Sequence, residues 1–249
     1  MRLVSAHPQL RQLRELHLRQ LHDAPRRKVF TTGLAAIDEL LPHPGGFARG
    51  AVHEVLADPA ADGLPRFFAL LLARAAARAM DGAHVAWCDA RGDLYPPAVA
   101  AAGLPLDRLL IVRPRAPADE VWAAAECMAC RGVAATVAAP PRLSRVEARR
   151  LQLAAERGGG AGILLRRVGP ASAAHYAAAT RWLVRPAAGS ETVQRWSVQL
   201  VHGHGGLVNQ TVLLEVSRDA FHTLRATMPT TNPVRALDPV ADRPAAATA

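Results

Sequence analysis

The chain alternates between short apolar runs and longer stretches in which apolar residues recur three or four positions apart. Runs of about four to eight apolar residues predict buried strands, and the longer stretches predict amphipathic helices. The expected strands are 51–56, 84–88, 109–112, 133–138 and 161–165. The expected helices are 8–22, a turn within 34–41, 66–80, 95–102, 118–131 and 144–157.

Strands that alternate with helices in this way predict an α/β fold. Right-handed crossovers place such strands in a mainly parallel sheet with helices on both faces. From Trp182 onward the pattern changes to period-two alternation, in 182–185, 194–202 and 210–216, with a glycine-rich turn at 203–206. This second pattern predicts an antiparallel hairpin at the carboxyl-terminal edge of the sheet.

Three regions follow from the pattern. Residues 1–27 form a basic N-terminal helix or arm, 28–228 form the core domain, and 229–249 form a disordered Pro/Ala-rich tail. In the arm, Leu13 and Leu21 belong to an apolar stripe flanked by basic residues (Arg11, Arg14 and Arg19). Two interpretations stay open: the helix packs on its own domain, or it docks on another protein.

Composition excludes several classes of protein. Of 249 residues, 50% are hydrophobic and 52 are alanine, which excludes a disordered chain. No window of about 18 uninterrupted apolar residues and no secretory leader is evident, so we expect a cytoplasmic protein without membrane contact. The three cysteines are too few for a disulfide framework, which agrees with a reducing compartment.

The net charge is +9, and Lys28 is the only lysine among 30 basic residues. Such an arginine bias reflects either coding composition or an anionic partner. Four arginines lie on or next to the helix 144–157 and are candidates for non-specific DNA or acidic-partner contact: Arg142, Arg145, Arg149 and Arg150. With Arg157, Arg166 and Arg167 they would form one basic face, and the alternative is a solvated surface.

The segments 31–41 and 45–55 resemble the residues that lead into the nucleotide-binding sheet of the RecA core, and Val85 to Ala90 provide a second match. The order of strands and helices over roughly residues 8–216 is similar as well. The resemblance implies a RecA-like P-loop NTPase core. Its chemistry requires a loop ending in Gly-Lys-Ser/Thr, which binds phosphates and magnesium.

That loop is degenerate here. The corresponding residues are Asp58, Gly63, Leu64, Pro65 and Arg66, so neither the lysine nor the hydroxyl is present. After the second strand, Arg91 stands where the resemblance places a catalytic glutamate, and an arginine cannot accept a proton. Residues 133–139 contain no aspartate for magnesium. We therefore expect no catalysis and no cofactor.

A RecA-like core without this chemistry resembles the ImuA family of damage-inducible mutagenesis proteins. The resemblance implies a non-catalytic accessory role in SOS translesion DNA synthesis. The implied partners are an ImuB-type Y-family-like protein, a DnaE-type error-prone polymerase and RecA. One alternative is a SulA-like inhibitor of cell division acting on FtsZ, and a less favoured one is an active RecA-like DNA-dependent ATPase.

Two further patterns have simple interpretations. Cys127 and Cys130 are spaced as Cys-x-x-Cys but fall late in a helix, where neither redox nor zinc chemistry is expected. His202 and His204 flank a glycine turn without a further ligand, so no metal site is predicted. His53 is expected at the edge of the core.

Overall fold

The computed structural model describes residues 28–42, 45–59, 61–169, 178–203, 205–217 and 224–228. The predicted arm (1–27) and tail (229–249) lie outside these residues, and so do Arg11, Leu13, Arg14, Arg19, Leu21 and His204. The predictions about them therefore stay predictions.

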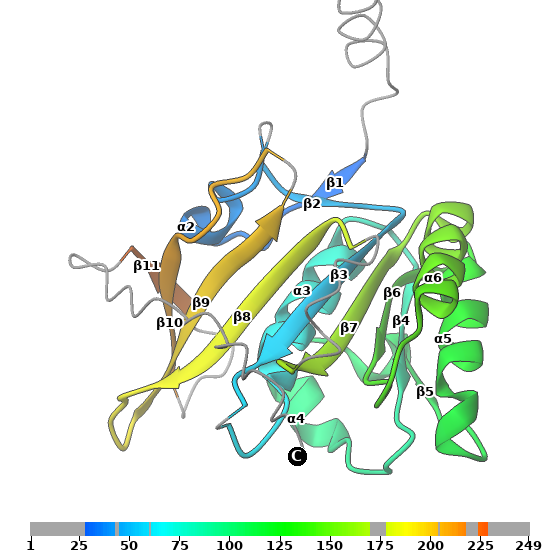
Figure 1. The fold of residues 1–249 in the computed structure, drawn as a ribbon. Helices are drawn as coiled ribbons and strands as arrows, with labels where there is room; N and C mark the ends of the chain where they lie inside the picture. The colour runs from blue at the N-terminus through cyan, green and yellow to red at the C-terminus, as the bar shows by residue number, and fades with distance from the viewer. Residues whose placement is uncertain are drawn as a thin grey trace, which may run out of the picture.

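A nine-stranded sheet runs through the described part of the chain in the order β11-β10-β9-β8-β3-β7-β6-β4-β5 (Figure 1). Six neighbouring strands, from β8 to β5, are parallel, and β9 to β11 are antiparallel. The strand bounds are β3 Ala51–Ala57, β4 His84–Cys88, β5 Leu109–Val112, β6 Val133–Ala138, β7 Ala161–Arg167, β8 Thr180–Ala187, β9 Val193–Gly203, β10 Thr211–Ser217 and β11 Leu224–Thr227. The predicted α/β class and mostly parallel sheet are confirmed.

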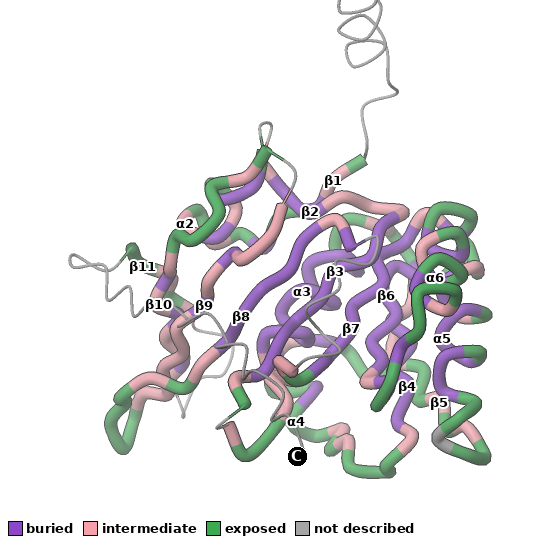
Figure 2. Tube along the Cα trace, in the orientation of Figure 1, coloured by how far each residue is buried: buried purple, intermediate pink, exposed green. Residues whose placement is uncertain are grey.

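The helices cover both faces of the parallel part, as Figure 1 shows. The bounds are α2 Ala35–Asp38, α3 Arg66–Arg78, α4 Pro96–Ala101, α5 Glu120–Ala129 and α6 Arg145–Gly158, with 3-10 turns η1 Leu106–Arg108 and η2 Pro117–Asp119. On one face α3 buries Phe68 and Leu72 against Val55, Ile163 and Trp182. On the other, α5 and α6 pack together over a second apolar cluster, and both clusters are seen as buried chain in Figure 2.

Local chemistry fixes the helix ends. Ser144 and Glu147 form a reciprocal capping box at the start of α6, and Gly159 ends this helix in the left-handed conformation with φ +76°. Arg108 donates hydrogen bonds to three carbonyls around the end of α3, those of Ala77, Met80 and Ala83. These contacts satisfy groups that a helix terminus otherwise leaves without partners.

Three features differ from the sequence prediction. The strand that begins the alternating region, β8, pairs in parallel with β3 on one side and antiparallel with β9 on the other, so it joins the parallel sheet to the hairpin. The short strands β1 (Val29–Phe30) and β2 (Phe47–Ala48), which form a separate two-stranded sheet, and the edge strand β11 were not predicted. With two residues each, β1 and β2 are too short for a periodic signal, and β11 contains only two apolar residues, Leu224 and Ala226, in place of an apolar run.

His53 is fully buried in β3 rather than at the core edge. Its Nε2 donates to the Ala48 carbonyl at 2.9 Å, and its Nδ1 accepts from the Thr180 hydroxyl at 2.8 Å. Because both ring nitrogens have partners, the imidazole is accommodated among the rings of Phe30 and Phe47.

None of the helices in the described ranges combines the length and apolar character needed to cross a membrane.

Candidate functional site

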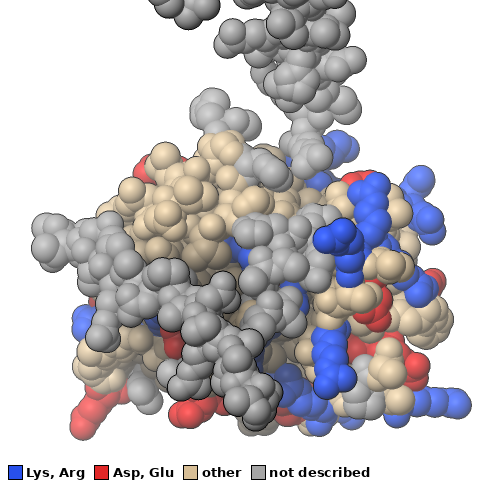
Figure 3. Space-filling model, in the orientation of Figure 1, with Lys and Arg blue, Asp and Glu red and all other residues tan. Residues whose placement is uncertain are grey.

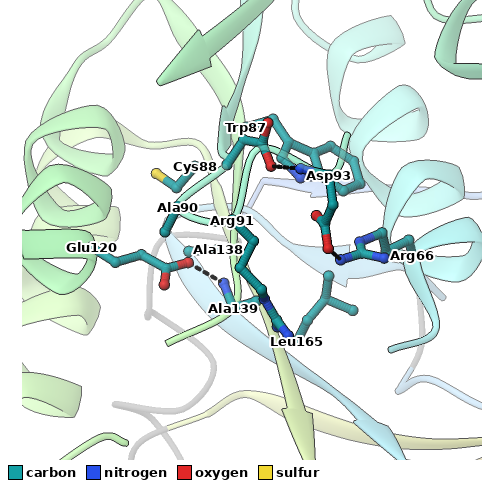
Figure 4. Close-up of a pocket in the computed structure, with 11 residues that line it drawn as sticks. Arg66, Trp87, Cys88, Ala90, Arg91, Asp93, Glu120, Ala138, Ala139 and Leu165 are labelled. Carbon is teal, nitrogen blue, oxygen red and sulfur yellow. Dashed lines mark hydrogen bonds and ion pairs between the residues drawn. The ribbon is translucent and has the colours of Figure 1, made fainter. Parts of the chain in front are cut away.

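The candidate site is a hollow at the carboxyl ends of β4, β6 and β7, beside the start of α3 (Figure 4). Ligands of open α/β sheets bind at this edge because the strand ends and helix starts converge there. The hollow is lined by Arg66, Trp87, Cys88, Asp89, Ala90, Arg91, Asp93, Glu120, Ala138, Ala139 and Leu165. Of the predicted phosphate-loop positions, only Arg66 lines it.

The loop from β3 to α3 is held by arginines of neighbouring strands. Asp58 accepts from Nε of Arg185 in β8 at 2.8 Å. Arg167 at the end of β7 donates to the carbonyls of Ala61 and Asp62, at 2.7 and 3.2 Å. A phosphate-binding loop presents backbone N–H groups to its ligand. In this loop, carbonyl and carboxylate oxygens instead accept hydrogen bonds from the guanidinium groups of Arg167 and Arg185.

The end of this loop does not supply phosphate ligands. Gly63 is exposed, Leu64 packs its side chain against the apolar core, and Pro65, the N-cap residue of α3, has no N–H to donate. Nη2 of Arg66 lies 2.5 Å from Oδ2 of Asp93, so the charge at the helix start is already paired.

Asp89 and Arg91 form the wall on the β4 side. Asp89 is buried, and its Oδ1 accepts from the amides of Asp93 and Leu94 at 3.0 and 3.3 Å. Its Oδ2 lies 3.5 Å from Nε of Arg113. Figure 4 shows the Arg91 side chain extending across the hollow, between Glu120 and Arg66 and toward Leu165.

Glu120, the first residue of α5, was missed by the sequence prediction. Its carboxylate is buried and accepts a hydrogen bond from the Ala139 amide at 2.7 Å (Figure 4). Burial raises the pKa of Glu120, and the hydrogen bond and the charge of Arg91 act in the opposite direction. The sequence signal that could have identified Glu120 is its place as an acidic residue at the start of a helix. Acidic residues at this position commonly do no more than interact favourably with the helix dipole.

The space left between these side chains is small. The cavity volume is about 20 Å³, enough for about one water molecule. Pockets for small-molecule ligands and cofactors measure roughly 300–1,000 Å³. In this arrangement the hollow has no room for a nucleotide.

The predicted basic face of α6 is only partly assembled. Arg142, Arg145, Arg149 and Arg150 are all exposed, and Arg150 lies 3.8 Å from Glu126 of α5. The prediction that Arg166 and Arg167 belong to this basic face was wrong. Arg167 binds the β3–α3 loop, and Arg166 is buried in β7, where side-chain alternation places it on the opposite face of the sheet from Arg167.

Arg166 belongs instead to a buried ion cluster on β3, β7 and β8. The Glu54 carboxylate, 1% exposed, accepts from Arg166 Nη1 at 2.9 Å and from Arg181 Nε at 2.6 Å. Each oxygen of the carboxylate has its own guanidinium. The cluster therefore joins three adjacent parallel strands through one anion.

All three cysteines are free, and the thiol that interacts with Cys127 is that of Cys88, not that of Cys130 as the Cys-x-x-Cys spacing would suggest. Cys130 is the exposed C-cap residue of α5, while the thiol of Cys127 is hydrogen-bonded to that of Cys88 at the end of β4. This bond lowers the pKa of Cys127 to about 7, although burial opposes the shift. Cys88 moves the other way, since the same bond and burial raise its pKa.

Within the described ranges, no three His, Cys, Asp or Glu side chains come together in a geometry that would hold a metal ion.

Comparison with known proteins gives relatives of one kind. No protein-family model matches the chain. Protein ImuA from each of two strains of Caulobacter vibrioides is 32% identical to the chain over 196 residues, which covers 72% of this chain and 80% of the relative.

Proposed function

The chain belongs to the ImuA family, and from that premise we propose that it is a non-catalytic accessory factor of damage-inducible (SOS) translesion DNA synthesis. In this role it holds an error-prone polymerase complex together through protein contacts. The partners are an ImuB-type Y-family-like protein, a DnaE-type polymerase and RecA.

The observation that carries the non-catalytic part is the closed carboxyl edge of the sheet. Its cavity of about 20 Å³ is crossed by Arg91, and the β3–α3 loop is tied to Arg167 and Arg185. A nucleotide would have to displace these contacts and then meet the carboxylates of Asp89, Asp93 and Glu120. Catalysis also needs a base near the reacting atoms, and Glu120 is engaged with the Ala139 amide.

The strand order supports a degenerate RecA-like core. The first parallel strand, β3, lies at the centre between β7 and β8, and the loop after β3 opens at the carboxyl edge. A P-loop occupies this place in a nucleotide-binding sheet. Here the place holds Asp58, Leu64 and Pro65 instead.

The role is tested in the host organism by damage-induced mutation frequency. Deleting the gene should lower mutation after ultraviolet irradiation, and the wild-type gene should restore it. Because no catalysis is involved, Arg66→Ala should restore it equally well. Loss of complementation by this variant, with the protein present at normal level, would contradict a non-catalytic role.

Binding assays separate this role from the SulA-like alternative. The purified chain should retain the ImuB-type protein and the DnaE-type polymerase in pulldown, and it should leave FtsZ polymerisation unchanged in a sedimentation assay. Inhibition of FtsZ without retention of the polymerase partners would support the alternative.

The N-terminal arm is proposed as one docking element. Leu13 and Leu21 supply its apolar stripe, and Arg11, Arg14 and Arg19 flank it. Changing the three arginines to glutamate should slow association and reduce its salt dependence. Leu13→Ala or Leu21→Ala should mainly speed dissociation. Each should cost about 1 to 3 kcal/mol of binding free energy if the side chain is fully buried at the interface. Unchanged binding of RecA and the ImuB-type protein by all these variants would make the arm an internal packing element.

A further inference from the structure

A groove opens at the amino ends of the parallel strands, on the edge of the sheet opposite the candidate functional site. Gly50 immediately precedes β3, and Gly158 and Gly159 end α6 just before β7. The cavity volume is about 570 Å³, far larger than that of the closed hollow. Its lining residues are Lys28, Arg49, Gly50, Met80, Arg131, Glu156, Arg157, Gly158 and Gly159.

The floor of the groove is a fixed backbone structure. The Gly50 amide donates to the Gly160 carbonyl at 2.7 Å, and Nε of Arg49 donates to the Gly159 carbonyl at 3.3 Å. A Cβ on Gly158 would lie 2.0 Å from the Met128 carbonyl oxygen, and one on Gly160 would lie 2.3 Å from that of Val133. The end of α6 is therefore packed against the α5–β6 connection, and its shape does not depend on a mobile loop.

The lining is strongly basic. Lys28, Arg49, Arg131 and Arg157 face a single acidic residue, Glu156. Part of this charge serves the fold, since Arg49 binds Gly159 and Arg157 lies in the last turn of α6, where a cation complements the helix dipole. In the described part of the chain, none of Lys28, Arg131 and Arg157 forms an ion pair, and all three are exposed.

The positive charge continues beyond the groove. Figure 3 shows Lys and Arg side chains over α6 and beside the start of β1.

We propose that this groove binds the phosphate backbone of a nucleic acid without reading its sequence. Among the lining residues that the structure describes, Met80 is the only large apolar side chain and none is aromatic. Protein interfaces depend on a few buried anchors, mostly Trp, Tyr and Arg. Because the described lining offers only charged side chains of this kind, an acidic peptide would be held mainly by charge. A chain of regularly spaced phosphates needs only charge, and Arg and Lys neutralise it with release of counterions.

The test measures binding of the full-length chain to a fluorescent single-stranded oligonucleotide by anisotropy over a salt series. The variant Lys28→Ala/Arg131→Ala/Arg157→Ala should weaken binding about ten- to hundredfold and reduce the slope of log K against log salt by about 2, since each single-strand phosphate contact contributes about 0.7. The three side chains are exposed, so circular dichroism and the melting temperature should match those of the parent.

The matched control removes the same charge from the β6–α6 connection and the first half of α6, away from the groove at the end of this helix, with Arg142→Ala/Arg145→Ala/Arg149→Ala. This control should lower the affinity and slope clearly less than the groove variant. Equal effects of the two triple variants would overturn the proposal, because they would reflect net charge alone. Competition by poly-glutamate as strong as that by an oligonucleotide of equal charge would overturn it as well, in favour of an acidic protein ligand.

This assignment does not rest on the proposed role in translesion synthesis. The groove variant should still retain the ImuB-type protein in pulldown, so loss of DNA binding and loss of partner binding are measured separately.

Discussion

Nδ1 of His53 in β3 lies 2.8 Å from the hydroxyl of Thr180 in β8, and this pair links two strands that are 127 residues apart in the sequence. The same hydroxyl accepts from the indole N–H of Trp182 at 2.9 Å. The Thr180 proton is therefore directed at His53, and Nε2 carries the imidazole proton toward the Ala48 carbonyl. The geometry suits a neutral histidine.

The first prediction concerns stability against pH. Burial lowers the pKa of His53 from 6.5 to about 4. Below pH 6.5 the unfolded chain binds a proton at this residue that the folded chain does not, so the free energy of unfolding falls as the pH drops toward 4. The shift corresponds to about 3 kcal/mol, present in full above pH 6.5.

Urea unfolding between pH 4 and 8 measures this effect. In His53→Gln the contribution should disappear, which flattens the profile in that window, while His84→Gln controls for removing an imidazole elsewhere. An unchanged profile in His53→Gln would show that other groups cause the acid sensitivity.

The second prediction concerns nucleotides. Because the hollow holds about 20 Å³ and is crossed by Arg91, ATP with magnesium should neither be hydrolysed nor raise the melting temperature. A ligand at 100 times its Kd would stabilise the fold by about 2.7 kcal/mol, which thermal unfolding detects easily. A magnesium-dependent shift, or turnover that Arg66→Ala abolishes, would contradict the prediction.

The third prediction concerns the buried ion cluster. Glu54→Ala leaves the guanidiniums of Arg166 and Arg181 without their shared carboxylate, which should cost about 3–5 kcal/mol of unfolding free energy. The exposed pair of Glu126 and Arg150 provides the control, because Glu126→Ala should cost less than about 1 kcal/mol. Chemical denaturation compares the two variants, and similar costs would argue against a structural role for the cluster.

The fourth prediction concerns thiol reactivity. Since the hydrogen bond from Cys88 lowers the pKa of Cys127 to about 7, alkylation of Cys127 by iodoacetamide should reach half its maximal rate near pH 7. In Cys88→Ala the midpoint should move to higher pH.

Mass spectrometry of the peptide containing Cys127 gives the rate at each pH. The Cys130→Ser background removes the exposed neighbouring thiol without touching the pair. A midpoint that stays at pH 7 after Cys88→Ala would mean that Cys88 does not stabilise the thiolate.

The sequence by itself determined the class of fold. Apolar runs such as His84–Cys88 and Val133–Ala138 predicted strands with the bounds that the structure gives. Strands covered on both faces are apolar throughout, and this signal is local. The sequence also indicated which residues the β3–α3 loop lacks, because loss of a lysine or a hydroxyl is visible without coordinates.

Only the tertiary structure decided which groups meet. Nothing local distinguishes β8 from the antiparallel strands after it, because its parallel neighbour β3 comes from far away in the chain. For the same reason Glu120 was not recognised as a wall of the hollow, Cys127 was compared with Cys130 instead of Cys88, and Arg166 was placed on the surface. The basic groove joins Lys28 just before β1, Arg131 between α5 and β6, and Arg157 in the last turn of α6. Contacts between distant segments depend on strand order and on the packing of whole helices, and periodicity in one segment carries no information about either.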